Sequence, residues 1–132
     1  MPSAPRIPLT ELLRRAVERL DRLSPDEAME ATWRGAILID TRPGGERDAQ
    51  GMIPGALSIE RTKLEWRLDP DSPSRDPRVG GLESKVILIC SEGYSSILAA
   101  ATLQDMGFSR ATDVVGGFEA WRDAGLPVEP PA

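Results

Sequence analysis

The sequence predicts an α/β protein with a mostly parallel sheet and helices on both faces. Two runs of consecutive apolar residues, 36–40 and 86–90, have the length of strands and are typical of strands buried on both sides. Amphipathic helical patterns alternate with such runs along the chain, which is typical of parallel sheets. A length of 132 residues, with 40% hydrophobic and 28% charged positions, fits one domain with a core of its own.

Two helices are expected before the first strand. Residues 9–23 carry apolar side chains at three- and four-residue spacing, which predicts an amphipathic helix that packs across the domain. A capping box from Ser24 to Glu27, with proline at the first helical position, predicts a second helix over 25–33 that ends at Gly35. We therefore divide the chain into an N-terminal amphipathic helical segment, 1–23, and a main domain, 24–132.

The middle of the chain predicts short elements and a long loop. Strand 36–40 is broken by residues 42–45, and a turn at 53–55 leads into a short strand at 56–59. A short helix is expected over 62–68. Residues 69–85 are rich in proline, glycine, serine and charge, which predicts a long surface loop.

The last third repeats the pattern of strand followed by helix. After the strand at 86–90 we expect a tight connection at 91–94 and a helix over 95–106 that ends at Gly107. A further strand at 111–115 and a final helix from 117 or 118 to 124, closed by Gly125, complete the expected sheet and its cover.

The composition excludes several kinds of catalytic site. The chain has no histidine and one cysteine, Cys90, so it cannot build Ser-His-Asp or Cys-His machinery by itself. A zinc site of His and Cys ligands, an internal disulfide and a CxxC redox pair are excluded for the same reason. We expect neither a metal nor a cofactor, and any thiol chemistry rests on Cys90 without a histidine base.

The charge balance argues against nucleic acid and membranes as partners. The net charge of −5 repels phosphate backbones and anionic lipid surfaces. No stretch approaches the roughly 20 apolar residues that a membrane span needs. A free cysteine without a disulfide partner is typical of a reducing compartment, so we expect a cytoplasmic protein. The oligomeric state is left open.

Cys90 stands where a buried strand gives way to a loop and a helix. The following helix directs its positive dipole end toward the thiol, and Gly93 permits the positive φ that a tightly curled loop requires. Both features favour the thiolate, which is the nucleophilic form of cysteine. From spacing alone, a cysteine that fills the end of a core strand is an equally good interpretation.

Four motifs in order resemble those of single-domain rhodaneses. Residues 40–42, Asp-Thr-Arg, resemble the family's Asp-x-Arg, and residues 51–56, Gly-Met-Ile-Pro-Gly-Ala, resemble Gly-His-Ile-Pro-Gly-Ala. Residues 90–96, Cys-Ser-Glu-Gly-Tyr-Ser-Ser, resemble the active loop Cys-x-x-Gly-x-Arg-Ser. Residues 116–121 with 125–128 resemble the closing Gly-Gly-x-x-Ala-Trp and Gly-x-Pro-Val. The resemblance covers almost the whole chain after the first helix.

The resemblance implies a rhodanese-like fold with a mostly parallel five-stranded sheet, and a sulfurtransferase mechanism. The Cys90 thiolate would attack the outer sulfur of a small donor such as thiosulfate, keep it as a persulfide, and pass it to a thiol or another thiophilic acceptor. The loop after Cys90 would bind the anion. Its residues are Ser91, Glu92, Gly93, Tyr94, Ser95 and Ser96. The six residues 90–95 match the loop length of the sulfur-transferring members, whereas related cell-cycle phosphatases have seven.

Three positions depart from the family pattern. Ser95 stands where the family has the loop arginine, so the cation that would clamp an oxyanion donor is absent there. Glu92 adds a carboxylate that repels both the thiolate and a dianionic donor. Met52 replaces a histidine of structural rather than chemical importance. Arg61 and Arg67 are candidate substitutes for the loop arginine, although ion pairs on a solvated helix face are the alternative interpretation of both.

Other residues are expected to have structural roles. Asp40 and Arg42 flank the end of a strand, and an ion pair that shapes the sheet edge is the favoured interpretation. The glycines at 116 and 117 predict close backbone packing, because the other residues of a nucleotide loop are missing. Tyr94 either lines the entrance to the site or forms a protein contact.

The leading hypothesis is therefore a small sulfurtransferase with Cys90 as nucleophile and persulfide carrier. The alternative is a rhodanese-fold binding or redox-sensing module with little or no sulfur-transfer turnover. Phosphatase or arsenate reductase chemistry ranks third, because the Cys-x5-Arg pattern needs arginine where Ser96 stands.

Overall fold

The computed structural model describes residues 5–131, and it confirms the α/β fold with a parallel sheet. The strands are β1 (Ile37–Asp40), β2 (Leu57–Ser58), β3 (Val86–Ile89) and β4 (Thr112–Asp113). They pair in the order β2-β1-β3-β4, and every pairing is parallel. Residues 1–4 and 132, which begin and end the two expected segments, lie outside the described residues.

The sheet has four strands rather than the five that the resemblance implied. Beyond β4, Leu23 forms only an isolated parallel bridge with Val114. Two backbone hydrogen bonds make this bridge, from Leu23 N–H to Asp113 O and from Val115 N–H to Leu23 O. The segment cannot continue as a strand because Pro25 begins a helix two residues later and has no N–H to donate to a ladder.

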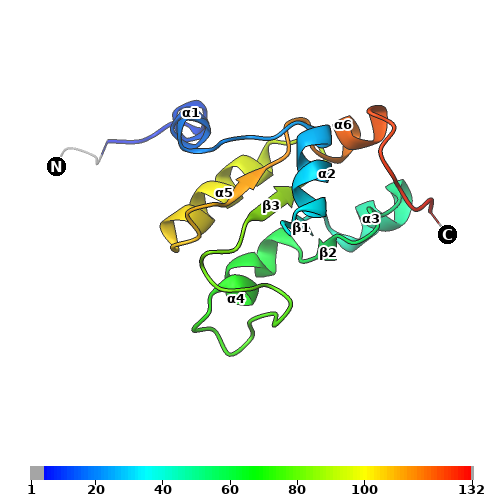
Figure 1. Cartoon of the computed structure of the whole chain (residues 1–132). Coiled ribbons are helices and arrows are strands. Elements are labelled where there is room, and N and C mark those ends of the chain that lie inside the picture. Colours follow the sequence, from blue (N-terminus) through cyan, green and yellow to red (C-terminus); the bar gives the residue numbers. More distant parts are fainter. Residues whose placement is uncertain (1–4, 132) are drawn as a thin grey trace.

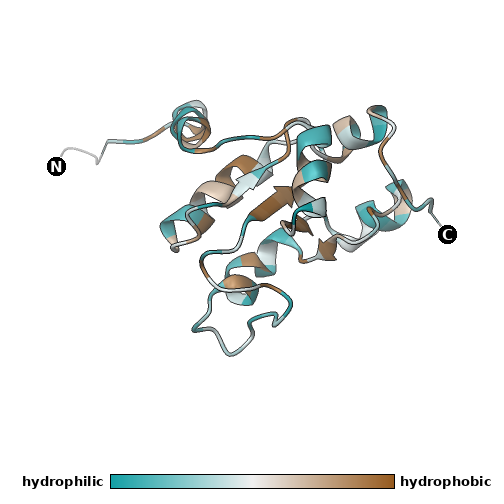
Figure 2. Cartoon of the chain, in the orientation of Figure 1, coloured by the Kyte–Doolittle hydropathy of each residue, from teal (hydrophilic) through white to brown (hydrophobic). Residues whose placement is uncertain are grey.

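Helices cover both faces of the sheet (Figure 1). One face carries α1 (Leu9–Arg19), α4 (Leu64–Leu68) and α5 (Ser95–Asp105), and the other carries α2 (Pro25–Trp33) and α6 (Gly117–Asp123). Alternate β3 side chains enter the two cores: Val86 and Leu88 pack toward α5, and Ile87 and Ile89 toward α6. Figure 2 shows β3 as hydrophobic along its length, as expected for a strand with both faces covered.

The helix expected over 9–23 is shorter and only partly covered. It ends at Arg19, and Ala16 and the following Leu20 are buried in the core that α5 shares. Leu9, Leu12 and Val17 remain exposed. These side chains are exposed because α1 lies at the edge of the molecule and packs against α5 on one side (Figure 1). The packing predicted for this helix is therefore right for one side of its apolar face.

Two elements of the middle region need comment. The helix expected over 62–68 is a 3₁₀ turn, η1 (Arg61–Lys63), followed by α4. A further helix, α3 (Gly44–Gln50), has no fully buried residue, so hydrophobic periodicity did not indicate it.

The long loop is held by Asp76, whose buried carboxylate accepts hydrogen bonds from Arg78 and Arg67. Within residues 5–131, no helix has both the length and the apolar character to cross a membrane.

The strand order determines where the two loops that matter meet. The chain leaves β1 toward one edge of the sheet and leaves β3 toward the other, so β1 and β3 form a topological switch point. Their carboxyl ends are in register, with Asp40 beside Ile89. The loops that follow β1 and β3 are therefore neighbours, which is where open parallel sheets place their ligands.

Candidate active site

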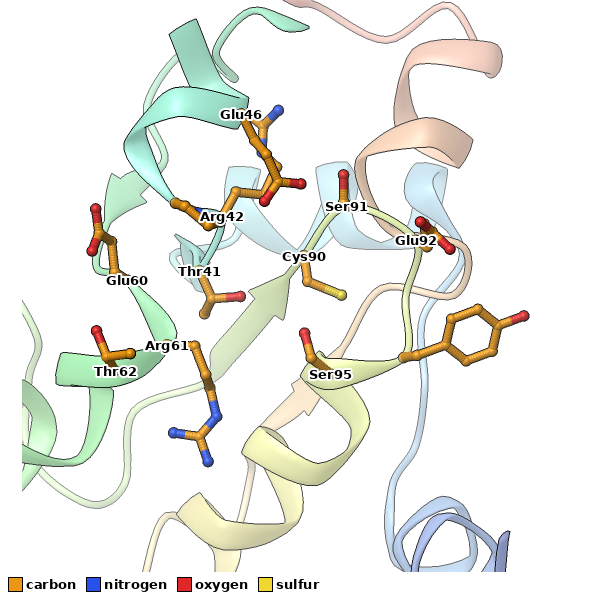
Figure 3. Close-up of a pocket in the computed structure, with 12 residues that line it drawn as sticks. Thr41, Arg42, Glu46, Glu60, Arg61, Thr62, Cys90, Ser91, Glu92 and Ser95 are labelled. Atoms are coloured by element: carbon orange, nitrogen blue, oxygen red, sulfur yellow. The ribbon is translucent and has the colours of Figure 1, made fainter. Parts of the chain in front are cut away.

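A pocket of about 490 Å³ opens at this switch point, and the Cys90 thiol lies in its wall (Figure 3). Cys90 is 6% exposed, so the thiol is largely buried but still reaches the pocket. Polar and charged side chains dominate the lining, which comprises Thr41, Arg42, Pro43, Glu46, Glu60, Arg61, Thr62, Cys90, Ser91, Glu92, Tyr94 and Ser95.

The loop after Cys90 curls back on its sulfur. The N–H of Gly93 donates a hydrogen bond to Sγ at 3.2 Å, and Sγ lies 3.2 Å from Ser96 Oγ in a second hydrogen bond. Gly93 has φ +87, a conformation that L side chains rarely adopt. The first N–H groups of α6 hold the outer side of the loop: Phe118 N–H donates to Cys90 O at 2.7 Å and Glu119 N–H to Ser91 O at 3.1 Å.

This environment lowers the pKa of the Cys90 thiol below its ordinary value. Burial alone raises the pKa of the thiol, because the charged form is poorly solvated. Hydrogen bonding by the Ser96 and Ser95 hydroxyls and by the backbone N–H groups of Ser96 and Gly93 favours the thiolate and outweighs the burial. The net effect on the pKa is downward, so the thiol ionises more readily than an ordinary cysteine.

A chain of hydrogen bonds continues from Ser96 into the interior. The Ser96 hydroxyl donates to Asp113 Oδ2 at 2.7 Å, and the Asp113 carboxylate is fully buried. Arg22 closes the chain with two bonds, from Nε to Oδ1 at 2.8 Å and from Nη2 to Oδ2 at 3.1 Å. The same Nη2 donates to Gly93 O at 2.9 Å. The active loop is thus tied to a residue that lies between α1 and α2.

Some of the remaining loop residues line the pocket, and others are buried beneath the loop. Glu92, Tyr94 and Ser95 are exposed and line the pocket, and Tyr94 is 65% exposed. Ser91 is half-buried, and its hydroxyl donates to Gln50 Oε1 at 3.4 Å. Gly93 and Ser96 are buried beneath the loop.

Of the two arginines considered as substitutes for the loop arginine, the structure brings only Arg61 to the pocket. Arg61 forms an ion pair with Glu65 at 2.7 Å, and Figure 3 shows its guanidinium directed away from the Cys90 thiol. Arg67 reaches Asp76 at 3.4 Å and contributes to a separate hollow beside Lys63. Neither guanidinium takes the place of an arginine in the loop.

Asp40 and Arg42 form a buried ion pair at the end of β1. Arg42 Nη2 lies 2.8 Å from Asp40 Oδ2, and the two side chains are 1% and 2% exposed. The guanidinium also donates to Gln50 Oε1 and Gly51 O, and it stacks 3.9 Å from the centre of the Phe118 ring. This arrangement uses the Arg42 charge inside the fold.

The comparison with protein families bears directly on this geometry. The family model of the rhodanese-like domain matches residues 24–124, and thus includes β1, the pocket and the loop around Cys90. The chain belongs to the rhodanese-like family.

Individual relatives of this rhodanese-like chain agree with the assignment. It is 36% identical over 109 residues to the thiosulfate sulfurtransferase GlpE of Pseudomonas putida, covering 82% of this chain and 89% of that protein. Its fold matches a Rhodopseudomonas palustris protein of unknown function, described as a possible tyrosine phosphatase, with a TM-score of 0.85, 35% identity and coverage of 98% and 99%. It also matches the polysulfide-sulfur transferase homodimer of Wolinella succinogenes, with a TM-score of 0.71, 27% identity and coverage of 88% and 82%.

Several residues around the loop that follows Cys90 were not predicted from the sequence. Asp113 carried one signal, because a carboxylate in the strand expected at 111–115 needs a buried partner. Arg22 and Gln50 carried none, since each is an ordinary polar residue in its local sequence. Within residues 5–131, no cluster of three or more His, Cys, Asp or Glu side chains has the arrangement of a metal site.

The charges at the mouth of the rhodanese pocket are mainly negative. Glu46, Glu60 and Glu92 line it, and the two arginines that line it are already paired, Arg42 with Asp40 and Arg61 with Glu65. A dianionic ligand would therefore approach three carboxylates without an unpaired cation among the described lining residues.

Proposed function

We propose that this rhodanese-like protein is a sulfurtransferase that carries a sulfane sulfur as a persulfide on Cys90. The observation that carries the proposal is the Cys90 sulfur itself: it reaches an open pocket and accepts a hydrogen bond from the Gly93 N–H of its own loop. A cysteine that merely filled the end of a core strand would be sealed by apolar side chains. Relatives of this chain named as thiosulfate sulfurtransferase and polysulfide-sulfur transferase support the same chemistry.

The reaction needs two displacements at sulfur and no histidine. In the first, the Cys90 thiolate attacks the outer sulfur of the donor, the new S–S bond forms, and the donor's bond to that sulfur breaks. With thiosulfate, sulfite leaves with the bonding electron pair, and the enzyme holds Cys90–S–S⁻. In the second, an acceptor thiolate attacks the outer sulfur, the enzyme's S–S bond breaks, and the Cys90 thiolate is restored. The loop N–H groups stabilise the anion at both stages.

The donor is proposed to be a low-molecular-weight persulfide with a single negative charge in preference to thiosulfate. The pocket presents Glu46, Glu60 and Glu92, and its two arginines are already paired, so a dianion is poorly accommodated. A singly charged persulfide meets less repulsion. The acceptor is a thiol or a similar thiophile, and a free thiol without a disulfide partner favours the cytoplasm as the place of action.

Phosphatase chemistry is less well supported despite the wording attached to the Rhodopseudomonas relative. The phosphatase pattern needs an arginine six residues after the cysteine, and this chain has Ser96 there, buried against Asp113. A carboxylate at that depth repels a phosphoryl group. The loop also has the six-residue length of the sulfur-transferring members.

Intact mass spectrometry tests the proposal. The protein is incubated in turn with thiosulfate, mercaptopyruvate and cysteine persulfide, and its mass is measured without reduction. We expect a gain of one sulfur atom, largest with the persulfide, that disappears on adding a thiol acceptor. Cys90→Ser, which has no thiol, is the matched control and should gain nothing. No adduct with any donor would overturn the proposal and favour the binding or redox-sensing module.

A further inference from the structure

Arg22 reaches the active loop without entering the pocket. It lies just before the Leu23 bridge to β4, and its side chain is 18% exposed. The guanidinium makes two bonds to the Asp113 carboxylate and one to the Gly93 carbonyl oxygen. It lies outside the set of described residues that line the pocket, so it does not touch a bound donor. Its contacts are instead with the Asp113 carboxylate and the Gly93 peptide, which adjoin the two groups that bond to the Cys90 sulfur.

The first of these groups is the hydroxyl of Ser96, which has a single hydrogen to share. Ser96 Oγ lies 2.7 Å from Asp113 Oδ2 and 3.2 Å from the Cys90 sulfur. When the hydrogen is held by the carboxylate, the oxygen offers the sulfur only lone pairs, which suits a protonated thiol. When the hydrogen turns to the sulfur, it stabilises the thiolate. The negative charge on Asp113 that no cation balances therefore determines whether Cys90 prefers the thiol or the thiolate form.

Arg22 satisfies that charge. Because Nε and Nη2 bind both carboxylate oxygens, Asp113 competes less strongly for the Ser96 hydrogen, and its negative charge beside the thiol is balanced. The second supported group is the peptide of Gly93. The bond from Arg22 to Gly93 O helps to fix the loop segment whose N–H at Gly93 donates to the sulfur.

We propose that Arg22 is a positioning residue for Cys90: it balances Asp113 and anchors Gly93, so that the Ser96 hydroxyl and the Gly93 N–H serve the thiolate. The inference rests on the proposed role of Cys90 as a nucleophile. Arg22 also supplies a cation to this loop, which has Ser95 in place of an arginine. The cation comes from the segment between α1 and α2 and contacts the Gly93 carbonyl oxygen rather than the pocket.

Other charged residues surround the pocket and the thiol and must stay constant in a test. On the pocket side these are Arg42, Glu46, Glu60, Arg61 and Glu92, and on the interior side they are Asp113 and Arg22. Changing only the two interior residues therefore isolates their contribution to the ionisation of Cys90.

The experiment is the pH profile of Cys90 alkylation by iodoacetamide, followed by intact mass on the full chain. Cys90 is the only thiol, so every adduct reports on it. Arg22→Met leaves Asp113 unbalanced, and we expect the midpoint of the profile to rise by about one to two pH units, the range typical of a neighbouring like charge. Asp113→Asn leaves Arg22 unbalanced, and the midpoint should fall. The double variant should return to within about half a unit of the parent.

The opposite directions of the two single variants separate positioning from a merely structural role. Loss of structure alone would expose Cys90 and move the midpoint of the profile up toward that of an ordinary cysteine in both variants. Arg19→Met is the matched control, since Arg19 belongs to the same segment but bonds to Ala101 O and Asp105, away from the loop. Its profile should coincide with that of the parent. If Arg22→Met fails to fold, the fall expected for Asp113→Asn still tests the proposal.

Coincident profiles for the parent, Arg22→Met and Asp113→Asn would overturn the inference, as would a rise in both. Because alkylation uses no sulfur donor, the result is independent of the sulfur-loading experiment. Sulfur loading together with coincident profiles would remove the role of Arg22 and keep the proposed function. Opposite shifts without sulfur loading would keep the role of Arg22 in thiol ionisation and remove the proposed function.

Discussion

The backbone of Gly117 lies directly against that of Gly93: a Cβ on Gly117 would stand 2.7 Å from the Gly93 nitrogen and would also meet the Cys90 carbonyl oxygen. Real Cβ atoms do not come so close, so both glycines are required by packing as well as by their positive φ. The predicted close backbone packing at residues 116 and 117 is confirmed. The active loop therefore takes its shape from the start of α6 as much as from its own sequence.

Gly117→Ala should displace the active loop. The added methyl group must push against backbone atoms on the loop, which cannot swing aside as a flexible side chain does. We expect a lower melting temperature and at least a tenfold slower gain of sulfur by Cys90, measured by intact mass over time. Gly125→Ala is the control, since it has φ +75 but nothing within 4 Å of its Cβ. Equal loss of sulfur loading in both variants would contradict the prediction.

The lowered pKa of Cys90 predicts the pH dependence of its reactivity. Because the folded thiol ionises at lower pH than an ordinary cysteine, alkylation should reach its plateau at lower pH than alkylation of glutathione. Ser96→Ala removes the hydroxyl that favours the thiolate, so the pKa of Cys90 should rise and the rate at neutral pH should fall. Ser91→Ala is the matched control, because that hydroxyl bonds to Gln50 rather than to the sulfur.

The same pKa shift has a defined sign in protein stability. The folded state favours the thiolate, so this contribution is complete above the pKa of the unfolded thiol and is lost as the pH falls through the lower folded pKa. The pH dependence of stability in that window should be weaker in Cys90→Ser. An unchanged dependence, or a Ser96→Ala profile that matches the parent, would show that the loop does not favour the thiolate.

The charges at the pocket mouth predict how donors are ranked. Glu92→Gln removes a carboxylate from the rim, so the rate of sulfur loading from thiosulfate should rise more than the rate from a persulfide. Arg61→Met should lower the thiosulfate rate by about two- to fivefold, the range expected of a solvent-exposed charge. Arg67→Met, with its charge outside the pocket, should leave the rate unchanged. Equal effects of Arg61→Met and Arg67→Met would contradict the assignment of Arg61 to the pocket.

The ion pair of Asp40 and Arg42 predicts a large loss of stability when one partner is removed. Asp40→Ala leaves a guanidinium buried at 1% exposure without its carboxylate, which typically costs about 3–5 kcal/mol in the free energy of unfolding. Urea unfolding measures it. Glu11→Ala, which removes surface ion pairs with Arg14 and Arg15, should change stability little. Similar losses in the two variants would show that the buried pair is not held as the structure describes.

Local patterns in the sequence predicted most of the fold. The capping box at Ser24 and Glu27 marked the start of α2, and both of its hydrogen bonds are present. The apolar runs became β1 and β3, buried as expected. The predictions failed where local pattern carries no signal. Helix α3 has no fully buried residue, so no apolar periodicity marks it. The number of strands depends on how many residues around Leu23 pair with the chain at Val114, which local sequence does not show.

Local patterns in the sequence place a lone cysteine after a buried strand, before a helix and in one loop with a glycine. Those features are local, and they left an activated thiol and a core cysteine as equally good interpretations until the resemblance to rhodaneses favoured the first. Only the tertiary structure decided which charges surround it: Arg22 and Asp113 behind the loop, Arg61 at the pocket, and Arg67 away from it. Local sequence does not assign these charges to their partners. A long polar side chain has many possible partners, and the packing of distant helices and strands selects among them.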